Sequence, residues 1–98
     1  MHILMHDIAE WHQRTFPDAT PEIVAEKLCE EATELLADIR DGKDWSEEAA
    51  DVFIVLSVLL RRYRDADDDI AEHVRAKMKI NRQRRWNKDA SGRYARAK

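Results

Sequence analysis

The spacing of apolar residues near the start of the chain predicts a short amphipathic helix over residues 3–13. Leu4, Ile8 and Trp11 recur three or four positions apart, which brings them onto one helical face. Phe16 and Pro17 interrupt this period, since the residue before a proline is biased away from helical geometry. We therefore expect the first helix to end before this pair.

A second amphipathic helix is predicted from residue 21 to about residue 40. Thr20 offers an N-cap hydroxyl, and Pro21 suits the first helical position. Gly42 can adopt the left-handed conformation that commonly follows a helix. The apolar positions of this segment recur at helical spacing and are Ile23, Val24, Leu28, Leu35, Leu36 and Ile39.

The third predicted helix is apolar around most of its circumference between residues 49 and 60. Asp44 followed by Glu47 resembles a capping box that would start this helix. A helix with so broad an apolar surface is normally covered on several sides, so we expect it to be the central helix of the fold.

The rest of the chain predicts a polar connection, a last helix and a tail. The connection is "RDADDD" at residues 64–69, which offers several N-cap residues. Ile70, Val74, Met78 and Asn81 follow one side of a helix that ends near Trp86. Residues 87–98 have no apolar period, and we expect a mobile basic tail there. Residues 1–86 would then form one folded domain.

Composition agrees with an all-α fold, because charged residues make up 38% of the 98 residues and only two Gly and two Pro are present. The elements predict a short N-terminal helix, an antiparallel helical hairpin and a C-terminal helix. A chain of this size buries a small share of its surface, and the third helix is broadly apolar. We therefore expect chains to assemble into a dimeric or tetrameric helical bundle.

Charge, cysteine content and the longest apolar run indicate the kind of environment in which the protein works. The net charge is −3, yet ten of the 24 residues from 75 to 98 are Lys or Arg. Cys29 is the single cysteine, so an intrachain disulfide is excluded. The longest apolar run, residues 52–60, is too short to span a bilayer. We expect a cytoplasmic protein that does not engage a membrane.

Carboxylates recur at helical spacing on both helices of the predicted hairpin. Lys27, Glu31 and Glu34 share one stripe of the second helix, and Glu48 and Asp51 share one stripe of the third. Residues equidistant from a turn centred at residues 42 and 43 lie level in an antiparallel hairpin. The level of residue 34 is therefore that of residue 51, flanked by residues 31 and 48.

Such a group of acids would repel itself unless a positive charge lies among them. A divalent cation with oxygen ligands is one answer, and Mg²⁺ suits carboxylates that share its coordination with water and phosphates. Solvated helix faces are the alternative, and they are the common fate of Glu pairs in a charged helical protein. The histidines lie outside both stripes and are His2, His6, His12 and His73.

The acidic pattern resembles that of the MazG-like all-α nucleoside triphosphate pyrophosphohydrolases, whose signature is E-E-x-x-E followed by E-x-x-D. Here it reads Glu30-Glu31-x-x-Glu34 and Glu48-x-x-Asp51. "WHQRTFPDAT" at residues 11–20 is similar to the N-terminal segment of short phage and bacterial members, and "KMKINRQRRW" at residues 77–86 is similar to their last helix.

The resemblance implies hydrolysis of a nucleoside triphosphate between the α and β phosphates, for cleansing or control of the nucleotide pool. The metal-binding acids it implies are Glu31, Glu34, Glu48 and Asp51. The implied phosphate-binding residues are Lys27, Lys77 and Asn81. Mg²⁺ is the implied cofactor, with Mn²⁺ as a possible replacement.

Charge and aromatic content add further candidates. Arg84 on the basic last helix can counter triphosphate charge. Either Glu31 or Glu34 can act as the general base that accepts a proton from the attacking water. Trp11 and Phe16 are the favoured base-pocket residues. The other aromatic candidates for stacking are Trp45 and Trp86.

Two alternatives remain open at this point. "EEATELL" and "EEAADV" are also similar to phosphoribosyl-ATP pyrophosphohydrolase, although the ending "KMKINRQRRW" favours the MazG-like branch. A noncatalytic helical module could instead bind nucleic acid through its basic end. The negative net charge and the absence of a nucleic-acid-binding motif count against that module. The base and sugar preference is not decided by the sequence.

Overall fold

The computed structural model describes residues 2–65 and 68–97, except for the side chain of His2. It divides into two compact units, Met1–Ala66 and Asp67–Lys98, and each is described by itself. Residues 66 and 67 of the predicted connection, and residue 98 of the predicted tail, lie outside the described residues. None of the helices in the described ranges is both long and apolar enough to cross a membrane.

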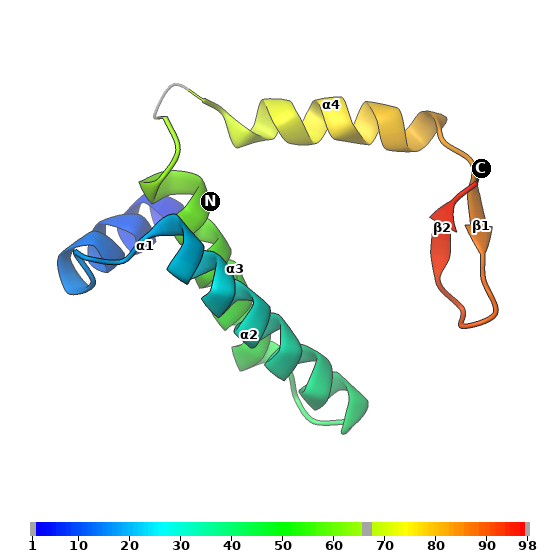
Figure 1. Cartoon of the computed structure of the whole chain (residues 1–98), viewed down its shortest axis with the longest axis horizontal. Helices are drawn as coiled ribbons and strands as arrows, with labels where there is room; N and C mark the ends of the chain where they lie inside the picture. Colours follow the sequence, from blue (N-terminus) through cyan, green and yellow to red (C-terminus); the bar gives the residue numbers. More distant parts are fainter. Residues whose placement is uncertain (1, 66–67, 98) are drawn as a thin grey trace. The chain divides into compact units, whose positions relative to one another are not determined.

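The first unit consists of α1 (His2–Thr15), α2 (Pro21–Arg40) and α3 (Ser46–Arg62). Helix α3 packs against both α1 and α2, and α2 and α3 form the expected helical hairpin (Figure 1). Both predicted ends of α2 are confirmed: Oγ1 of Thr20 accepts a hydrogen bond from the backbone of Ile23 at 3.2 Å, and Gly42 has a φ of 70°. Helix α1 extends beyond its predicted bounds at both ends.

The predicted capping box at the start of α3 is wrong. Trp45 is the N-cap residue, and its side chain makes no capping hydrogen bond. Asp44 lies one position earlier, and its Oδ1 accepts hydrogen bonds from the backbone N–H of Ser46 at 3.0 Å and from its hydroxyl at 2.7 Å. The carboxylate therefore closes a turn before the helix, which is a common alternative use of a short acidic side chain.

The buried interior of this unit is small. Ala9, Val24 and Val58 come from α1, α2 and α3 respectively and are at least nine-tenths buried. Ser57 is also buried, and its hydroxyl donates to the carbonyl of Phe53 at 2.7 Å. Several large apolar side chains of the hairpin remain 39–54% exposed and are Ile23, Leu36, Ile39 and Leu56. Helix α3 occupies the predicted central position between its two neighbours.

The second unit begins with α4 (Ile70–Gln83), which starts at the predicted polar connection. Oδ1 of Asp69 accepts from the backbone N–H of Ala71 at 2.9 Å, so one of the candidate N-caps is confirmed. The helix ends three residues before the predicted Trp86. The indole N–H of Trp86 instead donates to the carbonyl of Asn81 at 3.0 Å.

A β-hairpin follows α4, which makes the all-α prediction incomplete. Strands β1 (Trp86–Lys88) and β2 (Tyr94–Arg96) pair antiparallel, within the segment predicted as a tail. Oδ1 of Asp89 accepts hydrogen bonds from the backbone N–H groups of Ser91 and Arg93, and Gly92 has a φ of 89°. The hairpin is exposed on both strands, so no buried apolar face marks it in the sequence.

Candidate functional site

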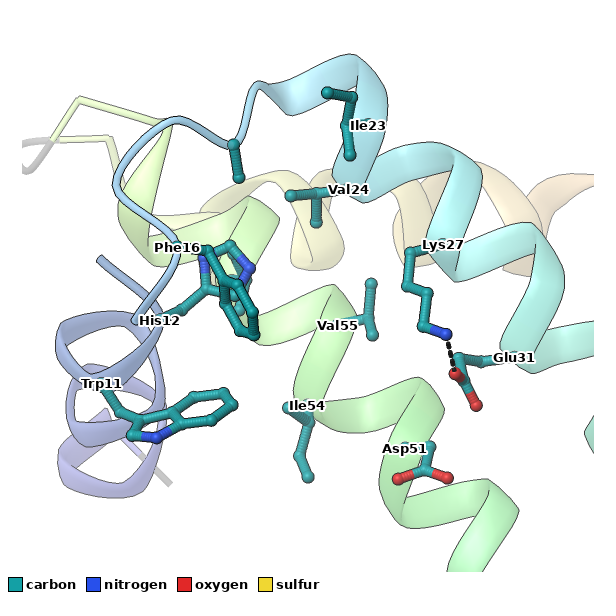
Figure 2. A pocket seen from close by; sticks show the side chains of 12 residues that line it. Trp11, His12, Phe16, Ile23, Val24, Lys27, Glu31, Asp51, Ile54 and Val55 are labelled. Atoms are coloured by element: carbon teal, nitrogen blue, oxygen red, sulfur yellow. Dashed lines mark ion pairs between the residues drawn. The ribbon is translucent and has the colours of Figure 1, made fainter. Parts of the chain in front are cut away.

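A cavity of about 390 Å³ opens between α1, the loop after it, α2 and α3 in the first unit (Figure 2). Its walls are mostly apolar, and a small group of charged side chains lies at one end. The aromatic and charged parts of the lining include Trp11, His12, Phe16, Lys27, Glu31 and Asp51. The aliphatic part of the lining comes from α2, α3 and the loop before α2.

The N-terminal wall of the cavity is aromatic. Trp11 and Phe16 meet edge to face, with ring centroids 5.7 Å apart and ring planes at 88°. The His12 ring is tilted against Phe16 at a centroid distance of 5.0 Å. Trp11 is 48% exposed and Phe16 is 47% exposed, so each ring leaves a large part of its surface open. Both sequence-predicted aromatic residues therefore line the cavity, and His12 joins them.

The end of α3 holds this wall in place. Arg62 donates from Nη1 to Nδ1 of His12 at 2.8 Å and to the carbonyl of Phe16 at 2.9 Å. Its Nη2 donates to the carbonyl of Pro17 at 3.2 Å. The hydroxyl of Tyr63 donates to the carbonyl of Ala19 at 2.6 Å. These bonds tie the loop between α1 and α2 to a helix more than 40 residues later.

Lys27 and Glu31 form the charged end of the cavity. Nζ of Lys27 lies 3.0 Å from Oε1 of Glu31, and 3.6 Å from the carboxylate of Glu30 outside the cavity lining. Glu31 is only 6% exposed, and its Oε2 is buried without a hydrogen-bond partner among the described residues. A buried carboxylate oxygen without a donor is costly, so this atom is a position where a cation would stabilise the folded protein.

The charges around Glu31 shift the pKa of its neighbours. The charge of Glu31, and a shared hydrogen bond with it, raise the pKa of Glu34 above its ordinary value. The hydrogen bond to Glu31 and the charge of Glu30 raise the pKa of Lys27. The predicted stripe of Lys27, Glu31 and Glu34 is therefore a contiguous charged cluster on α2.

Acids of α2 and α3 come together in two places in the structure. Glu31, rather than Glu34, shares the cavity with Asp51. Glu48 interacts with Asp38. A hydrogen bond from its own backbone N–H lowers the pKa of Glu48, whereas loss of solvent and the Asp38 carboxyl raise it. The net effect is a raised pKa. Residues 38 and 48 are equidistant from residue 43, so the predicted symmetry applies to this pair with a centre half a residue later.

A family model for dATP/dGTP pyrophosphohydrolases matches residues 4–97 of the chain. The chain belongs to the dATP/dGTP pyrophosphohydrolase family. It is a nucleotide pyrophosphohydrolase of the MazG-like type, as the acidic signature had indicated. The matched range includes the C-terminal hairpin of β1 and β2.

Two further comparisons agree with this family. A dATP/dGTP diphosphohydrolase of Cyanophage S-2L is 37% identical over 92 residues, which cover 91% of this chain and 80% of the relative. The solved structure of a MazG-like pyrophosphohydrolase of Cyanophage S-2L, bound to dGDP and three catalytic Mn²⁺ ions per active site, is similar with a TM-score of 0.78. That comparison covers 99% of this chain and 96% of the solved chain at 32% identity.

The residues of this family member fit the chemistry of a divalent metal site. Glu31 and Asp51 supply carboxylate oxygens to one cavity, and Glu34 lies beside Glu31. The buried Oε2 of Glu31 is in need of a positive partner. Within the described ranges no three His, Cys, Asp or Glu side chains already converge at one point. Assignment of the four predicted acids to a metal therefore stays a prediction.

The remaining predicted phosphate-binding residues of this pyrophosphohydrolase lie in the second unit. Lys77 and Asn81 are on α4, and Arg84 is its C-cap residue. They are spaced four and three residues apart, which brings them to one side of the helix. Their contact with phosphate also stays a prediction. Trp45 is the N-cap residue of α3 and is not part of the cavity lining, and Trp86 begins β1 in the second unit.

Sequence reasoning missed three residues in and around the site, which are His12, Arg62 and Asp38. His12 was considered only as a metal ligand, although it stands between Trp11 and Phe16 in the same segment. Its position beside Trp11 was the sequence signal that could have placed His12 in the cavity wall. Arg62 had no local signal, because the groups that it contacts are about 50 residues away in the chain. Asp38 would have been found by moving the centre of the hairpin by half a residue.

Proposed function

We propose that this protein hydrolyses purine deoxynucleoside triphosphates between the α and β phosphates, releasing a monophosphate and pyrophosphate, with Mg²⁺ as its cofactor. The observation that carries the proposal is a single cavity with an aromatic wall at one end and the Lys27–Glu31 pair at the other. Such a cavity suits a ligand with a flat base and a charged polyphosphate. The dATP and dGTP named for the relatives are the first candidate substrates.

The aromatic wall would hold the base. Trp11 and Phe16 offer partly open ring surfaces, on which a purine can stack at little conformational cost because the two rings already support each other. The cavity is large enough to bury a base and sugar. Stacking is tolerant of base identity, so a wall of this kind would accept both adenine and guanine.

The charged end would receive the phosphates and the metal. Glu31, Glu34, Glu48 and Asp51 are the proposed metal-binding carboxylates, and the relative with bound Mn²⁺ supports a divalent ion of this class. When bound, Mg²⁺ or Mn²⁺ supplies charge neutralisation of the phosphates and acidifies a water molecule. The positive charge of Lys27 is available to a phosphate oxygen once Glu31 has another partner.

The chain itself supplies positioning and proton transfer. Glu31 or Glu34 would accept one proton from the attacking water. The water oxygen would form a bond to the α phosphorus, and the bond from that phosphorus to the bridging oxygen would break, so that pyrophosphate leaves with the bridging oxygen. Lys77, Asn81 and Arg84 are proposed to balance the charge of the departing pyrophosphate. Activity of this kind would adjust the deoxynucleotide pool of the cytoplasm.

Assembly into a dimer or tetramer is part of the proposal. Helices α2 and α3 expose large apolar side chains, among them Leu36, Ile39 and Leu56. This exposed apolar surface is larger than we expect for a monomer of this size. Light scattering after gel filtration measures the mass directly. A monomer at micromolar concentration would contradict this part and leave the catalytic proposal standing.

The test of the proposed reaction is phosphate release after inorganic pyrophosphatase is added. The substrates are all canonical deoxynucleoside and ribonucleoside triphosphates, each with Mg²⁺, Mn²⁺ or EDTA. We expect metal-dependent release that is greatest for dATP and dGTP. Glu34→Gln and Asp51→Asn should lose it, while Glu26→Gln, an exposed change on α2, should retain it. Equal rates in all variants would show that the carboxylate cluster does not carry the reaction.

A further inference from the structure

The contact between Arg62 and His12 determines where the imidazole carries its proton. Nη1 of Arg62 lies 2.8 Å from Nδ1 of His12. A guanidinium group can only donate hydrogen bonds, so Nδ1 must be the acceptor. The imidazole is then neutral and carries its hydrogen on Nε2. Burial and the positive charge of Arg62 lower the pKa of His12, in agreement with a neutral ring.

Nε2 of His12 lies on the edge of the ring away from the Arg62 contact. The two nitrogens of an imidazole point away from each other, and Arg62 is not part of the cavity lining whereas His12 is. In the described part of the chain no protein group accepts a hydrogen bond from Nε2. The surrounding wall consists of Trp11, Phe16 and aliphatic side chains (Figure 2). His12 therefore presents an unused, oriented donor beside an aromatic stacking surface.

We propose that the Nε2–H group of His12 recognises the purine base by donating to its N7 atom, and that Arg62 is the positioning residue that fixes this tautomer. The inference rests on the proposed function for the presence of a purine nucleotide. It goes beyond that function by assigning the recognition of the base to one atom.

The choice of N7 follows from what adenine and guanine share. At position 6 adenine carries an amino donor and guanine a carbonyl acceptor, so a single donor there would accept one base and reject the other. N7 is an acceptor in both bases and lies on an open edge, whereas N3 lies beside the sugar. One fixed donor directed at N7 accounts for a family named for both dATP and dGTP.

The test compares purine nucleotides with their 7-deaza analogues, which lack only the N7 acceptor. Binding of dAMP, dGMP and both 7-deaza forms is measured by calorimetry with Mg²⁺ present. Wild type should bind the 7-deaza forms about five- to tenfold more weakly, the equivalent of one hydrogen bond. His12→Phe keeps an aromatic ring against Phe16 but has no donor, and it should bind each 7-deaza form within about twofold of its parent nucleotide. Equal binding of the analogues by wild type, or undiminished discrimination by His12→Phe, would overturn the proposal.

Two further variants separate recognition from folding. His12→Gln retains an acceptor for Arg62 and a donor for the base, so it should recover part of the 7-deaza discrimination that His12→Phe loses. His6→Phe changes an exposed histidine of the same helix and should keep the full wild-type discrimination. Thermal melts of each protein identify a variant that has not folded. Discrimination lost in both His12→Gln and His6→Phe would indicate a general effect of substitutions in α1 and would overturn the assignment.

The role of Arg62 is tested by the same comparison between purine nucleotides and their 7-deaza forms. Arg62→Met should reduce 7-deaza discrimination and raise KM for dATP and dGTP while kcat stays within about twofold, because binding of the base is affected rather than the reaction. Arg62→Lys should restore part of the discrimination. Arg61→Met, at the exposed neighbouring position, is the matched control and should match wild type. Full discrimination in Arg62→Met would remove Arg62 from the proposal.

Turnover measurements keep this inference distinct from the proposed function. A wild-type protein that hydrolyses 7-deaza-dATP and dATP with equal KM and equal kcat supports the proposed reaction and overturns recognition through N7. A wild-type protein that binds purines with the expected 7-deaza discrimination, yet releases no pyrophosphate, supports the role of His12 and overturns the proposed reaction.

Discussion

Nζ of Lys27 lies 3.0 Å from Oε1 of Glu31, while Oε2 of the same carboxylate is buried without a hydrogen-bond partner among the described residues. Within the described part of the chain, one oxygen of Glu31 is therefore paired with the Lys27 ammonium, and the other has no recorded hydrogen-bond donor. This asymmetry leads to separate predictions for the two residues, because an added metal ion would satisfy Glu31 and release Lys27.

Glu31→Gln should lower the rate of triphosphate hydrolysis by on the order of 100-fold, since it removes a proposed metal ligand without changing the size of the side chain. Stability toward urea should not fall, because a buried charge with an unpartnered oxygen is replaced by a neutral amide. Steady-state kinetics and urea titration of the same samples measure both. Full activity in the variant would exclude Glu31 from the metal site, and Glu26→Gln serves as the exposed control.

Lys27→Met should raise KM for dATP roughly tenfold, the equivalent of one charge-assisted hydrogen bond to phosphate. Binding of Mn²⁺ in the absence of nucleotide should be as tight as in wild type or tighter, because a competing cation has been removed from Glu31. Electron paramagnetic resonance of free Mn²⁺ measures this affinity. Lys43→Met changes a lysine of the connecting turn and should leave both quantities unchanged. Weaker Mn²⁺ binding by Lys27→Met would contradict the competition.

The stability of the fold should depend on the protonation of His12. Burial and Arg62 lower the pKa of His12 from 6.5, so the unfolded chain takes up a proton at a higher pH than the folded chain. The contribution of neutral His12 to the free energy of unfolding should therefore be complete above pH 6.5. It should be lost as the pH falls through the lowered pKa of His12 in the folded state.

The measurement for His12 is the urea midpoint of wild type and His12→Gln between about pH 7.5 and about pH 5.5. Wild type should lose more stability than the variant over this interval. The carboxylates titrate in both proteins, so the difference between the two curves isolates the imidazole. Parallel curves would show that the pKa of His12 is not lowered by folding.

Tyr63→Phe should destabilise the first unit by about 1 kcal/mol, because it removes the hydroxyl that donates to the carbonyl of Ala19 at 2.6 Å. Chemical denaturation followed by tryptophan fluorescence measures the change, with Trp11 close to the affected loop. Tyr94→Phe is the matched control, since Tyr94 is 67% exposed and in the second unit. Equal stability of Tyr63→Phe and wild type would mean that water replaces the lost bond.

Much of the helical architecture follows from local sequence. Thr20 and Pro21 start α2 at the predicted residue, and the helix ends at Arg40, shortly before the predicted Gly42. Asp69 starts α4 within the acidic connection. Each of these signals works through hydrogen bonds or backbone angles within a few residues, so no knowledge of the rest of the fold is needed. The spacing that brings Lys27, Glu31 and Glu34 together on α2 is equally local.

Other features could be decided only by the tertiary structure. The start of α3 depends on whether Asp44 caps the helix or closes a turn before it, and the two uses need the same residue type. The hairpin of β1 and β2 is exposed and therefore leaves no apolar period. Which acid of α2 shares the cavity with Asp51 depends on how the two helices pack against each other, which local sequence does not specify.

The sequence by itself determined the helices, the acidic signature and the aromatic pair Trp11 and Phe16, because each is encoded in residues that are near one another along the chain. The tertiary structure alone decided that Arg62 would fix the tautomer of His12, a contact across 50 residues. Long-range contacts of this kind depend on how whole helices pack. An arginine can donate to many kinds of acceptor, so its residue type does not specify which one it contacts.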